Sequence, residues 1–173
     1  MPKKQFLFIL LLSLVAFISR LIWHVPNFSP LASITIFTSY FASNKKYLWL
    51  PLLALLASDL IIGFYHWAVM LAVYSATALN ILIGWQLKKN KTSLNIISAA
   101  LLSSLSFFLI TNLAVWAAGE WYSKNLNGLA LCFNLAVPFF RSTLASNILY
   151  STLIFFVYDL LKEKMPEKKI SLN

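Results

Sequence analysis

The sequence predicts an all-α integral membrane protein: a single transmembrane domain over residues 1–173, with six transmembrane helices and both termini in the cytoplasm. Two observations predict this class. Of the 173 residues, 60% are hydrophobic and only 11% are charged, which is too little charge for a soluble domain. The lysines and arginines stand in short segments between apolar runs rather than in one patch. The net charge of +9 therefore indicates membrane topology and not nucleic-acid binding.

Local signals place the first three helices. The apolar run after the N-terminal lysines resembles a signal peptide, but no A-x-A-like cleavage site precedes Arg20, so it is predicted to remain as helix one. Ser29 and Pro30, an N-cap and a first-turn proline, begin helix two. Helix three has Pro51 in its first turn and ends near Gly63.

Charged and helix-breaking residues bound the later helices. Helix four is expected to end at the lysine cluster that starts with Lys88, and helix five at Gly119. The apolar stretch after Gly128 is too short to span, and Pro138 breaks it, so it is expected to be an interfacial or re-entrant segment. The helices are expected at residues 5–22, 30–43, 47–64, 67–87, 94–118 and 139–161, with the interfacial segment at 129–137.

The positions of the basic residues predict the orientation. Of the 14 lysines and arginines, the six-span arrangement leaves Arg20, Lys124 and Arg141 outside and the other eleven in the cytoplasm, a strong positive-inside bias. If residues 30–42 were re-entrant instead, the lysines at 45–46 and 88–91 would fall outside and the bias would vanish. Six crossings are therefore expected.

Asp59 is an acidic residue inside the predicted third helix. A charged carboxylate costs about 2.5–3.5 kcal/mol at the centre of a membrane helix, so such a residue usually has a partner or a function. We expect an arginine partner in the outer half of the membrane, Arg141 first and Arg20 second. This pair is either structural or part of a binding site, and the sequence leaves both open.

Stripes of aromatic and hydrogen-bonding residues are expected in the outer half. Phe108, Asn112 and Trp116 recur at four-residue steps and share one helix face. Similar stripes contain Tyr74 on helix four and Asn147 on helix six. Apolar walls with a few convergent polar groups are typical of small-molecule pockets. The candidate substrate-binding residues are Asp59, Tyr74, Asn112, Trp116, Arg141 and Asn147.

No motif indicates catalysis, a cofactor or a metal. The sequence has no Walker-type G-x-x-x-x-G-K, no G-x-G-x-x-G and no clustered histidine and cysteine ligands. Cys132 has no local orienting residue or oxyanion hole that would make it a nucleophile. The protein is therefore not expected to be an enzyme.

Four segments carry a resemblance to a known family. PNFSPLASITIF (Pro26–Phe37), SDLIIG (Ser58–Gly63), FFLITNLAVW (Phe107–Trp116) and GLALCFNLAVPFF (Gly128–Phe140) are similar to segments of an uncharacterised bacterial membrane family labelled as transport proteins. That family in turn resembles the substrate-binding S components of energy-coupling-factor (ECF) vitamin transporters. The resemblance implies six helices, cytoplasmic termini, and a site near the outer surface formed by the later helices and the loop after helix one.

The predicted function follows from the polar stripes and the resemblance together. We expect a protein of the inner (plasma) membrane that captures a vitamin-like or heteroaromatic micronutrient at an outward-facing pocket. The resemblance implies a transmembrane coupling subunit and ATPases encoded elsewhere, although helix one lacks the Ala-x-x-x-Ala pair through which S components commonly dock. The alternative is a structural or assembly membrane protein without a small-molecule ligand, whose outer polar residues join helices.

Overall fold

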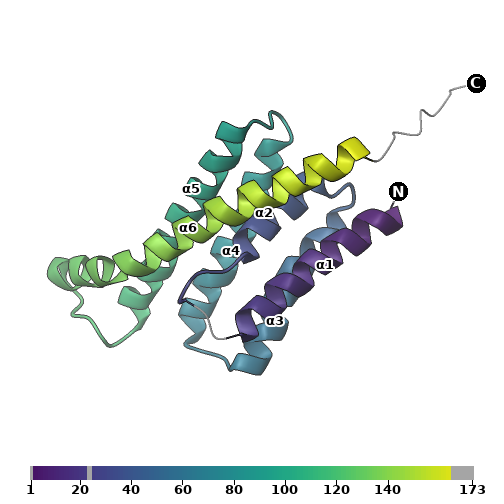
Figure 1. Cartoon of the computed structure of the whole chain (residues 1–173). Helices are drawn as coiled ribbons and strands as arrows, with labels where there is room; N and C mark the ends of the chain where they lie inside the picture. The colour runs from purple at the N-terminus through teal and green to yellow at the C-terminus, as the bar shows by residue number, and fades with distance from the viewer. Residues whose placement is uncertain (1, 23–24, 165–173) are drawn as a thin grey trace, which may run out of the picture.

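The computed structural model describes residues 2–22 and 25–164 (Figure 1). Within these residues the chain forms six α-helices and one short 3₁₀-helix, which confirms the predicted all-α class. Four of the helices, α1, α4, α5 and α6, are long and apolar enough to cross a membrane, so the protein is a multi-pass membrane protein. The elements are α1 Pro2–Leu21, α2 Leu31–Phe41, η1 Lys45–Leu48, α3 Trp49–Ile62, α4 Trp67–Leu87, α5 Ser93–Ala118 and α6 Leu126–Lys164.

The short helix α2 lies in the middle of the bundle, in contact with α1, α3, α4 and α6 (Figure 1). Eight of its 11 residues are buried, so it packs against neighbours on nearly every side. At 1.5 Å per residue it is about 16 Å long, roughly half the hydrocarbon thickness of a bilayer. The ring of Phe37 is fully buried and lies 5.2 Å from that of Phe155, which packs α2 onto α6.

A glycine allows α2 and α4 to approach closely. A Cβ atom added to Gly84 would clash with the carbonyl oxygen of Ile36 and with the hydroxyl of Ser39. At the same contact the Ser39 hydroxyl donates a hydrogen bond of 2.9 Å to the carbonyl of Ile81. The absence of a side chain at position 84 therefore brings the two backbones together.

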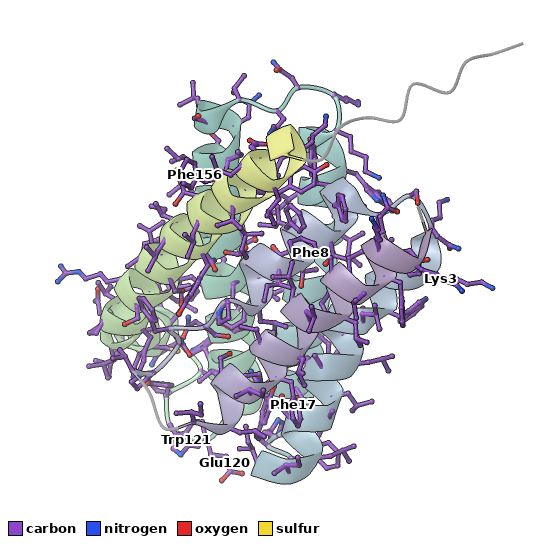
Figure 2. All side chains as sticks on the ribbon, turned by 45° about the vertical axis from the view of Figure 1, so that its right-hand side comes forward. Lys3, Phe8, Phe17, Glu120, Trp121 and Phe156 are labelled. Carbon is purple, nitrogen blue, oxygen red and sulfur yellow. The ribbon has the colours of Figure 1, made fainter. Side chains whose placement is uncertain are left out.

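The start of α1, the turn after α2 and the end of α4 lie together at one end of the bundle. Ser43 donates a hydrogen bond of 2.7 Å to Gln5, and the Lys88 ammonium donates one of 2.9 Å to the carbonyl of Ala42. We call this the lysine end, because it carries lysines 3, 45, 88 and 91. Lys3 lies at this end in Figure 2, whereas Glu120 and Trp121 lie at the opposite end.

The last helix differs from the prediction. We expected Pro138 to separate an interfacial segment at 129–137 from a final helix, but α6 is continuous from Leu126 to Lys164. A proline inside a helix costs about 3 kcal/mol because it removes a backbone hydrogen bond and clashes with the preceding turn. Packing against α5 offsets this cost: the ring of Phe108 lies 5.3 Å from that of Phe133 and 4.9 Å from that of Phe140, on both sides of the proline.

Candidate binding pocket

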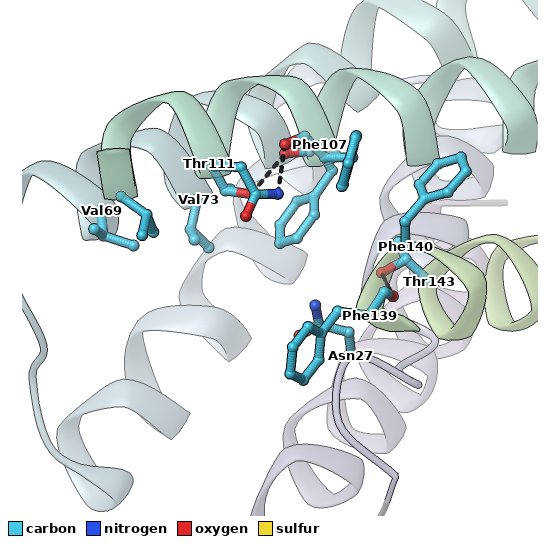
Figure 3. Close-up of a pocket in the computed structure, with 11 residues that line it drawn as sticks. Asn27, Val69, Val73, Phe107, Thr111, Phe139, Phe140 and Thr143 are labelled. Atoms are coloured by element: carbon cyan, nitrogen blue, oxygen red, sulfur yellow. Dashed lines mark hydrogen bonds between the residues drawn. The ribbon is translucent and has the colours of Figure 1, made fainter. Parts of the chain in front are cut away.

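A pocket of about 240 Å³ lies between α4, α5 and α6, toward the end opposite the lysine end. Figure 3 shows Val69, Val73 and Thr111 on one side of it and Asn27 and Phe139 on the other. Asn27 comes from the segment between α1 and α2 and has a backbone φ of 61°, a left-handed conformation that asparagine tolerates better than most residues. The full lining is Asn27, Val69, Val73, Phe107, Phe108, Thr111, Asn112, Val115, Phe139, Phe140 and Thr143.

The hydroxyl groups of α5 and α6 in this lining already use their donors, and the Asn112 amide uses one of its two. The hydroxyls of Thr111 and Thr143 donate to carbonyls four residues earlier, at 2.7 and 2.9 Å, and the Asn112 amide does the same at 2.7 Å. Among the described residues no donor reaches the hydroxyl oxygens or the Oδ1 atom of Asn112. Each oxygen keeps acceptor capacity. The pocket therefore offers hydrogen-bond acceptors, together with the second N–H of the Asn112 amide as a donor, between aromatic and aliphatic walls.

A charged network lies outside this lining. Arg20 on α1 pairs with Asp59 on α3, with 2.5 Å between Nη2 and Oδ1, and its Nε donates to the Ser58 hydroxyl at 2.6 Å. The Tyr74 hydroxyl on α4 donates to the second carboxylate oxygen of Asp59 at 3.0 Å. Asp59 is only 1% exposed. The network thus satisfies both oxygens of a buried carboxylate and joins three helices.

Tyr65, in the link between α3 and α4, lies near this network. Partial burial is the main cause that raises the pKa of Tyr65 to about 12; the negative charge of Asp59 adds to this increase and Arg20 opposes it. The phenol is neutral at pH 7, as a tyrosine with its ordinary pKa of 10.0 also is. It adds no charge beside the ion pair of Arg20 and Asp59.

The predicted arginine partner of Asp59 exists, but it is the second choice. Arg20 makes the ion pair, whereas Arg141 is exposed and forms no salt bridge with any described residue. Asp59 pairs with Arg20 because its helix, α3, packs mainly against α1, which carries Arg20, and not against α6, which carries Arg141. Asp59 and Tyr74 contact each other, as members of one predicted site should, but neither lines the pocket.

The other predicted residues lie in three different places. Asn112 lines the pocket. Asn147 is 1% exposed, and its amide donates to the Ser104 hydroxyl at 2.9 Å, which joins α6 to α5. Trp116 donates from its indole N–H to the carbonyl of Ser123 at 3.0 Å, and the ammonium of Lys124 lies 5.9 Å from the centre of its ring. Ligand contacts by Trp116 and Asn147 stay predictions, since neither residue is in the lining.

Several lining residues were not predicted as binding residues, although some carried a signal. Phe107, Thr111 and Val115 follow the same four-residue spacing as the predicted stripe, one position earlier along α5. Asn27 lies in the loop after helix one, where the resemblance to S components also places part of a site. Phe139 was not recognisable, because the predicted break at Pro138 left the direction of this segment open.

Comparison with known proteins gives a family and no function. Residues 1–168 match the model of a family described as a family of unknown function (DUF6580). No curated protein and no solved structure matches the chain. Because the family model covers nearly all of the sequence, this membrane protein belongs to DUF6580.

Proposed function

We propose that this protein captures a small, uncharged heteroaromatic molecule in the pocket between α4, α5 and α6, as the substrate-binding subunit of a micronutrient uptake system. The observation that carries the proposal is the pocket lining, which combines four phenylalanines with neutral hydrogen-bonding groups and contains no charged side chain. Aromatic walls favour a planar ring by offset or edge-to-face packing. A few fixed polar groups then select its orientation.

The size and hydrogen bonding of the pocket narrow the ligand class. Its volume of about 240 Å³ lies below the roughly 300–1,000 Å³ usual for drug-sized ligands, which favours a single or fused double ring. The acceptor oxygens of Thr111, Asn112 and Thr143 favour a ligand with N–H or O–H donors. A carboxylate ligand is disfavoured, because no cationic side chain in the lining would compensate its desolvation.

The proposed topology places this pocket near the outer surface. In a six-span arrangement the lysine end faces the cytoplasm, as the positive-inside rule requires. The pocket lies toward the other end of the bundle and therefore opens from outside the inner (plasma) membrane. The arrangement also matches the one that the resemblance to S components implies, because α4, α5, α6 and the loop after helix one all contribute.

The transport role and its partners rest on that resemblance. An S component supplies the substrate site, while a transmembrane coupling subunit and ATPases supply the energy. We propose the same division for this protein, with the partner proteins encoded elsewhere. In this role the chain binds and releases its ligand unchanged and performs no chemistry.

A second candidate, a structural or assembly membrane protein, is favoured by one specific observation. The Ser33 hydroxyl donates to the backbone carbonyl of Asn147 at 3.2 Å and accepts from Ser151 at 2.9 Å, and Asn147 donates to Ser104. These bonds join α2, α5 and α6 through buried polar groups, which is how polar residues commonly join membrane helices. A protein with only this role would release no small molecule on denaturation.

Mass spectrometry of small molecules released from the purified protein distinguishes the two functions. We expect a neutral heteroaromatic compound from the wild type. Its occupancy should fall about tenfold in Asn112→Ala, because a lost polar contact in a buried site costs on the order of 1–3 kcal/mol. Asn80→Ala is the matched control, since Asn80 is buried on α4 outside the lining. An empty wild-type protein, or full occupancy in Asn112→Ala, would contradict the proposal.

A further inference from the structure

A second cavity, of about 440 Å³, lies between α5 and α6 near the lysine end. Ile96 of α5 and several apolar residues of α6 line it, among them Leu149 and Phe156, which are 50% and 60% exposed. Exposed apolar side chains on membrane-spanning helices face lipid. The cavity is therefore a groove that is open to the acyl chains of the membrane.

The groove has the length of one leaflet. Its lining follows α6 from Leu149 to Asp159, a distance of about 15 Å at 1.5 Å per residue. The hydrocarbon core of a bilayer is about 30 Å thick, so the groove extends from one surface to roughly the midplane. One acyl chain of a phospholipid occupies the same depth.

An ion pair stands at the surface end of this groove. The ammonium of Lys91 lies 2.5 Å from both carboxylate oxygens of Asp159. The pair is accessible, because the side chains of Lys91 and Asp159 are 25% and 46% exposed. An ammonium has three N–H donors and a carboxylate about four acceptor sites, so two contacts leave each group able to bind a further partner.

We propose that this groove binds one membrane phospholipid whose headgroup carries a primary ammonium, as in phosphatidylethanolamine. One acyl chain fills the groove, the headgroup ammonium donates to Asp159, and the phosphate accepts from Lys91. The argument is charge complementarity, since a positive and a negative group on the lipid meet a negative and a positive group on the protein. A choline headgroup has no N–H to donate, and an anionic headgroup such as that of phosphatidylglycerol brings no positive charge to Asp159.

Competitive lipid retention tests this site in the full-length protein. The purified protein is incubated with equal amounts of phosphatidylethanolamine, phosphatidylcholine and phosphatidylglycerol of identical acyl chains, and retained lipid is counted by native mass spectrometry. We expect the wild type to prefer ethanolamine over choline lipid about fivefold, which corresponds to about 1 kcal/mol at 25 °C. Asp159→Asn and Lys91→Gln should bring the ratio close to one. Glu120→Gln, an exposed acid at the opposite end, should leave it unchanged.

Equal retention of the ethanolamine and choline lipids by the wild type would overturn the proposal, and so would an unchanged ratio in Asp159→Asn. A preference for phosphatidylglycerol would also overturn it, because it would indicate a general attraction of anions by the lysine end. A second measurement needs no variant and so does not depend on folding of Asp159→Asn. Stepwise N-methylation of the ethanolamine headgroup should lower retention by the wild type toward that of the choline lipid. A constant retention along this series would also reject the site.

Discussion

At the scale of single residues, Asp59 shows how the chain stabilises a charge in an apolar bundle. Its carboxylate is almost fully buried, yet Arg20 and Tyr74 each donate to one of its oxygens. Pairing and hydrogen bonding together offset the cost of removing the charge from water. The three helices that carry these residues are therefore held together at this point by polar contacts.

The first prediction concerns the ion pair. Arg20→Gln alone should lower the free energy of unfolding in detergent by about 3–5 kcal/mol, because it leaves the buried Asp59 carboxylate uncompensated. Asp59→Asn should cost less, because the Arg20 side chain that it leaves unpaired is 22% exposed. The double variant should lose less than the sum of the two single losses, with a coupling of about 1–3 kcal/mol. Thermal unfolding of the four proteins in one detergent measures this cycle.

The cycle of Asp59 with Arg141 is its control. Arg141 is exposed and lies on α6, so Arg141→Gln should change stability little, and its effect should add to that of Asp59→Asn. Additive losses in the Arg20 cycle would contradict the ion pair that the structure contains.

The second prediction separates two asparagines that the sequence treated alike. Asn147→Ala should destabilise the protein by about 1–3 kcal/mol, because it leaves the Ser104 hydroxyl buried without its donor. Asn112→Ala should cost less, since its amide bonds only within its own helix turn. Thermal unfolding without ligand measures both, and equal losses would contradict this division.

The sequence could predict which residues share one face of a helix, because helix periodicity sets this. It could not predict which side chain of another helix a residue contacts, because the packing of the helices sets that. The four-residue stripe puts Phe108 and Asn112 on one helix face, and both line the pocket, whereas Trp116 of the same stripe does not. Arg20 and Arg141 were expected at the same depth, so depth alone could not identify the partner of Asp59. The pairing of α1 with α3 determines it, and this contact between distant segments has no local signal.

At the scale of elements, α6 shows tertiary contacts prevailing over a local signal. Pro138 predicts a helix break, but ring contacts from Phe108 to α6 on both sides of the proline retain one helix. The boundaries of α4 and α5 were predictable to within one residue, because lysines and Gly119 end their apolar runs. No comparable charged residues flank Pro138, so the sequence did not show where α6 starts.

The third prediction tests the close approach of α2 and α4. Gly84→Ala should destabilise the protein by about 1–3 kcal/mol, because the added Cβ would overlap the backbone of Ile36 and the side chain of Ser39. Ser75→Ala, at an exposed position of the same helix, should stay within about 0.5 kcal/mol of the wild type. A Gly84→Ala protein as stable as the wild type would show that the two helices can separate without cost.

At the scale of the whole molecule, four helices are long and apolar enough to cross a membrane, and the two short helices α2 and α3 meet at the lysine end. The turn after α2 lies beside the N-terminal part of α1, through the contact of Ser43 with Gln5, and beside Lys88 at the end of α4. Both short helices therefore extend to the lysine end. The lysines near residues 3, 45 and 88 consequently gather on one side of the bundle, which is the side that the positive-inside rule predicts to be cytoplasmic.

The fourth prediction is the orientation itself. Lys45 and Lys89 are exposed at the lysine end, whereas Lys124 is exposed in the loop between α5 and α6 at the other end. Single cysteines at these positions, in a background without Cys132, report their side of the membrane. In intact cells a membrane-impermeant maleimide should label position 124 and not positions 45 or 89.

Permeabilised cells provide the control, because all three exposed positions should then react. Labelling of position 45 in intact cells would mean that α2 is re-entrant and returns to the outer side, and it would remove the charge bias that orients the chain. Labelling of positions 45 and 89 but not of position 124 would instead indicate the opposite orientation of the protein in the membrane. The pocket between α4, α5 and α6 would then open to the cytoplasm, where a ligand taken up from outside could not reach it first.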